Sequence, residues 1–199
     1  KPDSFLRTVL RDSQQIELPE LYAVGAVMLN TDDQQRSAAK NILEQELTAQ
    51  GLKILAWRDV PTDNNCLGPI AIESLPAFEQ VFVGPGEITD EKHFSARLFM
   101  GRRKAEKQLT DDTSFHIASL GTNILSYKGL MMPVDLPGFY LDLADERLET
   151  AICVFHQRFS TNTMPRWPLA QPFRMLAHNG EINTIVGNRN WSVARTPKY

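Results

Sequence analysis

The distribution of apolar and polar residues along the chain predicts a series of strands and helices. Residues 21–29 form an almost uninterrupted apolar run of strand length, which is typical of a buried strand. Thr31 and Gln34 then have the spacing of a capping box, which predicts a helix starting at Thr31, and Gly51 provides its stop. The same reading predicts further strands at 53–58, 77–83, 115–120, 124–129 and 150–156, and helices at about 89–109, 136–143 and 181–195.

The order of these elements predicts a mixed fold. Several strands follow one another in hairpin-like pairs, and the helices do not alternate strictly with single strands. This order is unlike the βαβ alternation of a parallel sheet. No repeat or linker divides the chain, and 199 residues is the size of one domain or of a large piece of one. We therefore expect an α+β architecture of layered sheets and helices.

Composition and charge argue against several classes of protein. Lys and Arg number 21 and Asp and Glu number 24, which gives a net charge of −3, whereas a general nucleic-acid binder usually carries a basic surface. The two cysteines, Cys66 and Cys153, are too few for a disulfide framework or for a Cys-rich zinc or iron–sulfur site. Cys153 lies in an apolar run and is expected to be a buried, inert thiol. No apolar run approaches the roughly 18–20 residues of a membrane span, so we expect a cytoplasmic protein.

Two polar clusters near the C-terminus hold the candidate functional residues. The first, 156–163, directly follows the predicted strand 150–156, and the second, 178–183, lies between an apolar run and the last predicted helix. Polar side chains at the ends of strands are typical of sites rather than of cores. Neither cluster has a His or Cys spacing that supports a metal site, so no metal is expected.

Each candidate residue taken alone has an ordinary structural interpretation. Arg158 can clamp a carboxylate with two hydrogen bonds, but a lone arginine is more often part of a structural ion pair. Thr161 is more often a turn or cap residue than a ligand. Asn179–Gly180 is first a turn signal, although an Asn amide and a Gly N–H can also form an oxyanion hole.

The two clusters together favour the functional interpretation. His156-x-Arg158-Phe159-Ser160-Thr161, followed by His178-Asn179-Gly180-Glu181-Ile182, resembles the motif of the class II glutamine amidotransferases. The similarity covers nearly the whole chain and is strongest to those members that use the released ammonia to aminate 2-oxoglutarate. It is carried by the runs at 54–61, 127–130, 140–143, 155–167 and 176–191.

This resemblance implies a fold of the N-terminal-nucleophile hydrolase type. In that fold two antiparallel sheets lie between helical layers, as a four-layer αββα sandwich. Residues 1–199 are then expected to be part of one glutamine amidotransferase domain, incomplete at both ends.

The resemblance also implies a role for each candidate residue. The family hydrolyses L-glutamine to glutamate and ammonia. Arg158 matches the clamp for the glutamine α-carboxylate, Thr161 matches a hydroxyl that helps to hold the substrate, and Phe159 matches a position that binds it through the backbone. Asn179 and Gly180 match the oxyanion hole. His178 and Glu181 match positions that flank the oxyanion hole and have supporting roles.

One part of the family's machinery has no counterpart in this sequence. The family nucleophile is a Cys at the very N-terminus, whose own α-amino group acts as the base. Lys1 stands first here, and neither Cys66 nor Cys153 has the required context. We expect the nucleophile upstream of Lys1 and an α-amine-binding Asp downstream of Tyr199, and we expect the segment alone to be inactive.

The resemblance implies further partners and cofactors for the parent protein. In the ammonia-using members, ammonia passes through a tunnel to a second site, where FMN and an iron–sulfur cluster supply electrons for the amination of 2-oxoglutarate. No cofactor is expected in this segment. The expected partners are L-glutamine, the remaining domains of the parent chain and a small NAD(P)H-oxidising subunit, with no nucleic acid or membrane.

Two alternatives remain open. The chain could belong to another class II amidotransferase, one that makes a purine, an amino sugar or asparagine. It could also be a module of the same fold that lacks the nucleophile and only binds glutamine, glutamate or a partner protein.

Overall fold

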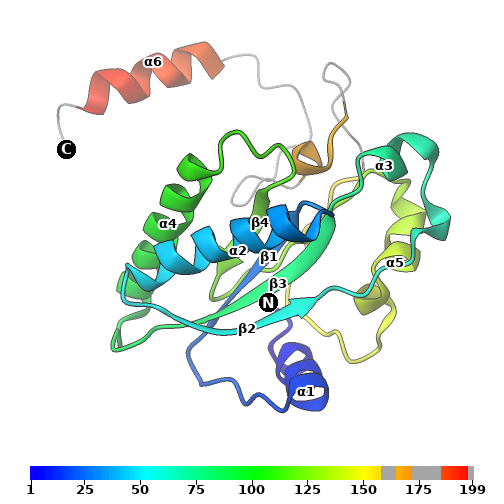
Figure 1. Cartoon of the computed structure of the whole chain (residues 1–199), viewed down its shortest axis with the longest axis horizontal. Helices are drawn as coiled ribbons and strands as arrows, with labels where there is room; N and C mark the ends of the chain where they lie inside the picture. Colours follow the sequence, from blue (N-terminus) through cyan, green and yellow to red (C-terminus); the bar gives the residue numbers. More distant parts are fainter. Residues whose placement is uncertain (158–164, 172–184, 197–199) are drawn as a thin grey trace.

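A computed structural model of the chain describes residues 1–157, 165–171 and 185–196. Its centre is a four-stranded antiparallel sheet with the order β2-β3-β1-β4 (Figure 1). The strands are β1 (Ala23–Leu29), β2 (Lys53–Asp59), β3 (Ala77–Gly84) and β4 (His116–Gly121). The helices are α1 (Asp3–Gln14), α2 (Asp33–Thr48), α3 (Pro69–Glu73), α4 (Glu91–Gln108), α5 (Leu136–Phe139) and α6 (Ile185–Arg195). Short 3₁₀ turns are η1 (Asn64–Cys66), η2 (Pro133–Asp135), η3 (Leu141–Ala144) and η4 (Trp167–Leu169).

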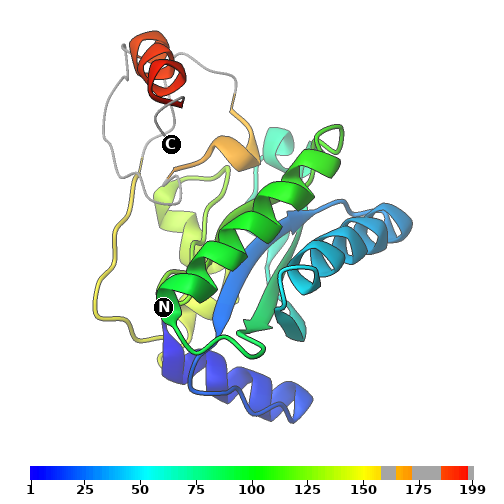
Figure 2. The same ribbon diagram turned by 90° about the vertical axis from the view of Figure 1, so that its left-hand side faces the viewer.

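One face of the sheet is mainly apolar, with the buried Glu79 as a charged exception, and is covered by two helices. In the antiparallel register Val27 lies opposite Glu79 on β3 and opposite Ile117 on β4, so these side chains share a face. The long helices α2 and α4 pack on this face, side by side (Figure 2). Their buried residues form the main core together with apolar residues of the sheet, and they include Ala39, Leu43, Leu47, Phe94, Leu98 and Ala105.

Both covering helices begin at an aspartate. The Asp32 side chain accepts hydrogen bonds from the backbone N–H groups of Gln34 and Gln35, so Asp32 caps α2. The sequence placed this cap at Thr31, which is wrong by one residue. Asp90 caps α4, where its side chain accepts a hydrogen bond from the backbone N–H of His93. After α2 the chain turns through Gly51, whose φ of +80° suits glycine, as the stop signal predicted.

The opposite face of the sheet is covered in two parts. Near one end α1 packs against Tyr22, Val24 and Phe82. Near the other end Phe78 contacts three aromatic residues: Phe139 at the end of α5, Tyr140 between α5 and η3, and Trp167 in η4. Between these parts Arg58, Gln80, Ala26 and Ser119 occupy facing positions across the four strands. The middle of this face is therefore partly polar.

Most of the predicted elements are confirmed. The strands at 21–29, 53–58, 77–83 and 115–120 correspond to β1, β2, β3 and β4. The helices predicted from Thr31 and at about 89–109 correspond to α2 and α4, and the described part of the last predicted helix is α6. The α+β class is confirmed, with one antiparallel sheet in the described residues.

The strand predicted at 124–129 is wrong. The backbone N–H of Ser126 donates to the Ser119 hydroxyl at 3.0 Å instead of joining a strand ladder. The segment crosses the partly polar face, where side chains bind its polar groups. The helix predicted at 136–143 is confirmed only in part, because extended backbone at Tyr140 separates α5 from η3.

The buried strand predicted at 150–156 is also wrong. These residues are extended chain without strand pairing, and Ile152 is 79 % exposed and Phe155 71 % exposed. Cys153 is exposed as well, so the expectation of a buried thiol is not met. An apolar run becomes a strand only where a neighbouring strand accepts its hydrogen bonds, and the described residues provide none at this place.

None of the helices in the described ranges has both the length and the apolar character that crossing a bilayer requires.

The crossing of α2 and α4 depends on Gly101. A Cβ at this position would lie 2.9 Å from Leu47 Cδ2 and 3.1 Å from the Glu46 carbonyl oxygen. We predict that Gly101→Ala lowers the free energy of unfolding by about 1–3 kcal/mol, because the helices must move apart. Urea unfolding followed by circular dichroism measures this change.

Gly138 in α5 provides the matched control, because nothing lies within 4 Å of a Cβ there. Gly138→Ala should leave stability unchanged or slightly raised. Equal effects of the two substitutions would contradict the packing argument.

Candidate active site

All residues predicted for the active site lie outside the described residues. They are Arg158, Phe159, Thr161, His178, Asn179, Gly180 and Glu181. The described residues 165–171, here called the connector, link the two candidate clusters along the chain. The structure therefore describes part of the chain between the two clusters, together with the residues that this part contacts.

A buried ion pair joins the sheet to residues 124–144, here called the covering segment because they lie on the polar face of the sheet. Arg58 on β2 donates from Nη1 to Asp142 Oδ2 at 2.8 Å and from Nη2 to Asp142 Oδ1 at 2.6 Å. The two side chains are only 11 % and 3 % exposed. Such a bidentate pair fixes the relative orientation of the two side chains as well as the distance between them. It ties residues that are far apart in the sequence.

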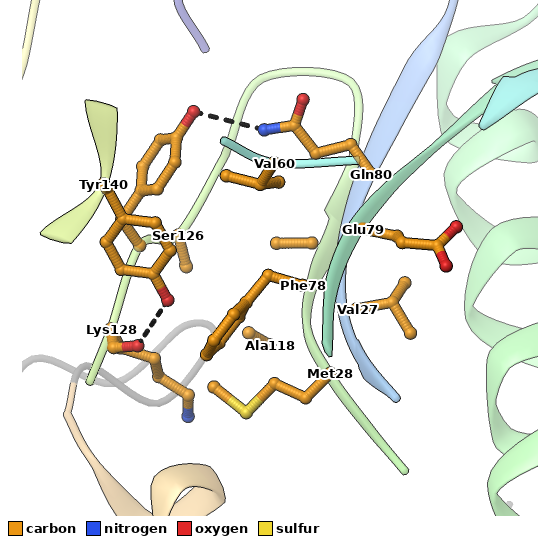
Figure 3. Close-up of a pocket in the computed structure, with 12 residues that line it drawn as sticks. Val27, Met28, Val60, Phe78, Glu79, Gln80, Ala118, Ser126, Lys128 and Tyr140 are labelled. Atoms are coloured by element: carbon orange, nitrogen blue, oxygen red, sulfur yellow. Dashed lines mark hydrogen bonds between the residues drawn. The ribbon is translucent and has the colours of Figure 1, made fainter. Parts of the chain in front are cut away.

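Gln80 and Tyr127 complete a network around this ion pair. Arg58 Nη1 also donates to Gln80 Oε1 at 3.0 Å. Gln80 Nε2 donates to the Tyr127 hydroxyl at 3.1 Å, a bond drawn as the dashed line at Gln80 in Figure 3. Tyr127 in turn donates to Asp142 Oδ2 at 2.8 Å. Every member is therefore hydrogen-bonded, which a buried polar group needs to avoid a large desolvation penalty.

The network has clear protonation states. Burial, followed by the negative charge of Asp142, raises the pKa of the Tyr127 phenol far above its ordinary value. Burial alone would lower the pKa of Arg58, but the hydrogen bonds and charge of Asp142 outweigh it and raise that pKa. Tyr127 therefore stays a neutral donor and Arg58 stays a cation at physiological pH.

Lys128 connects this region to the connector. Its side chain is buried, and Nζ donates to the carbonyl oxygens of Pro168 at 2.8 Å and Ala170 at 3.0 Å. The Tyr140 hydroxyl donates to the backbone carbonyl of Lys128 at 2.8 Å (Figure 3). Both the backbone and the side chain of Lys128 are thus held in place.

Trp167 fixes the connector from a second direction. It is 2 % exposed, and its indole Nε1 donates to the Ala71 carbonyl oxygen at 3.1 Å. Its ring packs on Phe78 and Phe139, with centroids 5.4 Å and 5.7 Å away. The connector is therefore fastened to the body of the molecule by both polar and apolar contacts.

A small cavity of about 20 Å³ lies between the sheet and this covering segment (Figure 3). Its lining includes Ala26, Met28 and Phe78 on one side and Ser126, Lys128 and Tyr140 on the other. This volume suits a single water molecule, while pockets for small-molecule ligands are about 300 Å³ or larger. The cavity is too small to hold glutamine.

The described residues contain no group of three or more His, Cys, Asp or Glu that could hold a metal ion. The whole chain has two cysteines, fewer than the four ligands of an iron–sulfur cluster. Such a cluster would need ligands from elsewhere.

The sequence analysis missed the network and the fastening of the connector. Tyr127-Lys128-Gly129 and the run at 140–143 contributed to the family resemblance, but no role could be assigned to them. Arg58 and Asp142 are 84 positions apart, so no local pattern pairs them.

The comparison with known proteins assigns the chain to a family. A family model described as "Glutamine amidotransferases class-II" matches residues 1–199. The chain therefore belongs to the class II glutamine amidotransferases, as the two clusters predicted.

Individual relatives are all much longer than this chain. It is 44 % identical over 177 residues to the glutamate synthase [NADPH] large chain of Azospirillum brasilense, an alignment that covers 86 % of the chain and 12 % of the relative. It is 38 % identical over 202 residues to the corresponding chain of Bacillus subtilis, covering 100 % and 13 %. The ferredoxin-dependent glutamate synthase 1 of Arabidopsis thaliana is 39 % identical over 175 residues, covering 86 % and 11 %. The chain thus spans about an eighth of the length of these relatives or slightly less.

Removal of Arg58 should be strongly destabilising. We predict that Arg58→Met lowers the free energy of unfolding by about 3–5 kcal/mol, because Asp142 is left buried without its cation. The double variant Arg58→Met/Asp142→Asn should recover part of this loss. Urea unfolding of Arg58→Met, of Asp142→Asn and of the double variant measures the coupling.

Strictly additive effects, within about 0.5 kcal/mol, would contradict a direct interaction between the two side chains.

Proposed function

We propose that this chain is part of the glutaminase domain of a glutamate synthase large chain. In this proposal the parent protein hydrolyses L-glutamine to glutamate and ammonia, and the ammonia aminates 2-oxoglutarate reductively to a second glutamate. The observation that carries it is the family match over residues 1–199, joined by identities of 38–44 % to glutamate synthases. These relatives support this branch over purine, amino-sugar or asparagine synthesis.

The proposed chemistry divides the work between the two clusters. Arg158 binds the α-carboxylate of glutamine with two hydrogen bonds, and Thr161 and the Phe159 backbone help to orient the substrate. A terminal Cys, which this sequence does not include, attacks the side-chain amide. The thiol proton passes to the α-amino group of that Cys and then to the amide nitrogen, which leaves as ammonia when the C–N bond breaks.

The second cluster stabilises the charge that develops in this reaction. The Asn179 side-chain amide and the Gly180 N–H donate to the oxyanion of the tetrahedral intermediate. One such donor contributes about 2.7–4 kcal/mol to the stability of the transition state. His178 and Glu181 flank these donors in supporting roles. Water then releases glutamate from the acyl-enzyme.

The proposed fold is the four-layer αββα sandwich of N-terminal-nucleophile hydrolases, with residues 1–199 as part of one domain. The antiparallel sheet, with α2 and α4 on its apolar face, supports the assignment of one sheet and one helical layer. The polar face, where the connector is fastened, is then the side that faces the second sheet.

The remaining proposals concern the parent protein. Its FMN and iron–sulfur cluster belong to other parts of the polypeptide, with ammonia passing between the sites through a channel. Its partners are L-glutamine, the other domains of its own chain and a small NAD(P)H-oxidising subunit, and its place is the cytoplasm, in nitrogen assimilation and glutamate biosynthesis.

The test is a glutaminase assay of the full-length gene product with two substitutions. Asn179→Ala should lower kcat about 100- to 1,000-fold, because an oxyanion donor is lost. Arg158→Lys should mainly raise the KM for glutamine, because a lysine cannot form the two-pronged contact with a carboxylate.

Matched controls are Asn65→Ala and Arg103→Lys, whose side chains are exposed in η1 and α4. Both should leave kcat and KM unchanged. Absence of glutaminase activity in the unsubstituted protein, or equal effects of Asn179→Ala and Asn65→Ala, would overturn the proposal. Glutamine-dependent formation of glutamate from 2-oxoglutarate separates glutamate synthase from the other amidotransferases.

A further inference from the structure

We propose that Lys128 is a positioning residue for glutamine hydrolysis, because it holds the connector between the two substrate-binding clusters. The inference rests on the proposed function. It assigns a role to the motif Tyr127-Lys128-Gly129, which the proposed chemistry does not use.

The first observation is the environment of the Lys128 ammonium. Its side chain is buried, yet Nζ donates to two backbone carbonyls of one short segment, those of Pro168 and Ala170. A buried cation is costly unless its hydrogen bonds are made, so this arrangement strongly favours one backbone position for the connector. Loss of the ammonium would release both carbonyls at once.

The second observation is the close packing of Gly129. A Cβ at this position would lie 2.9 Å from Cζ3 of Trp167, the aromatic residue of the connector. Only a glycine allows the backbone to approach the indole ring this closely. Two adjacent residues of one motif therefore hold the connector in different ways. Lys128 forms hydrogen bonds with it, and the backbone of Gly129 packs closely against its Trp167 ring.

The third observation is that the motif itself is fixed to the sheet. The Tyr127 hydroxyl donates to Asp142, which is paired with Arg58 on β2, and it accepts from Gln80 on β3. Tyr140 holds the Lys128 backbone carbonyl. These hydrogen bonds, together with those of Lys128, thus fix the connector relative to the sheet.

The consequence for catalysis follows from the order along the chain. The connector follows the cluster that contains Arg158 and Thr161 and precedes the cluster that contains Asn179 and Gly180. One cluster binds the α-carboxylate and the other stabilises the oxyanion, so both must reach the same glutamine molecule. A misplacement of about 1 Å can reduce the rate of an enzyme about 100-fold.

The test compares two lysine variants of the full-length gene product. Lys128→Met should lower kcat/KM for glutamine hydrolysis about 10- to 100-fold, with a rise in KM. Lys40→Met is the matched control, since Lys40 on α2 pairs with buried Glu79 at 2.5 Å on the opposite face of the same sheet. It removes a partly buried ammonium without touching the connector, so it should lower the thermal midpoint while leaving KM and kcat within twofold.

A second variant covers the case in which Lys128→Met does not fold. Trp167→Phe keeps an aromatic ring but removes the indole N–H that binds the Ala71 carbonyl. Because the loss of one neutral hydrogen bond loosens the connector less than the loss of the ammonium, this variant should lower kcat/KM only about three- to tenfold.

The possible outcomes separate the two proposals. An unsubstituted protein without glutaminase activity overturns the proposed function, and this inference with it. An active unsubstituted protein with normal KM and kcat in Lys128→Met, or in Trp167→Phe where the former does not fold, overturns the inference alone. Equal losses of kcat/KM in Lys128→Met and Lys40→Met indicate a purely structural role and overturn it as well.

Discussion

The buried ion pair between Arg58 and Asp142 is the interaction on which the rest of this structure depends. It holds the covering segment, residues 124–144, against the polar face of the sheet, although this segment forms no strand. Because both side chains are almost fully buried, each needs the other, and the Tyr127 and Gln80 hydrogen bonds complete their environment. With this segment in place, Lys128 reaches the connector and Trp167 finds its aromatic partners. The two faces of the sheet therefore have different roles. The mainly apolar face forms the core with α2 and α4. The polar face, through the covering segment, holds the connector between the two candidate clusters.

The sequence predicted those elements whose pattern is local. β1 is a continuous apolar run, β3 and α4 carry their own periodicity, and Gly51 marks a turn by its conformational freedom. The predictions at 124–129 and 150–156 failed for a common physical reason, since both runs are apolar enough for a strand but pair with no strand in the described residues. The exposed Cys153 follows from the second failure. The error at Thr31 is smaller, because neighbouring Asp32 is an equally good cap and takes its place.

The candidate site illustrates the same distinction between local and distant information. Arg158 and Asn179 each had an ordinary interpretation, and only their joint motif with its neighbours identified the family. The fastening of the connector could not be predicted, because Lys128 and Ala170 are 42 positions apart and Arg58 and Asp142 are 84 apart. Such pairs become visible only when the sheet and its covering segment are placed together. The family resemblance thus points to the residues that we propose touch substrate, whereas the structure explains the motif that holds the chain between them.

The most direct test is a crystal structure of the full-length gene product with a glutamine analogue bound. The account predicts that the α-carboxylate of the analogue lies about 2.7–3.2 Å from the Arg158 guanidinium and its amide oxygen equally close to Asn179. It also predicts that Lys128 Nζ still binds the carbonyls of Pro168 and Ala170. An analogue bound away from both clusters, or a connector displaced from Lys128 while the substrate is held in place, would contradict it.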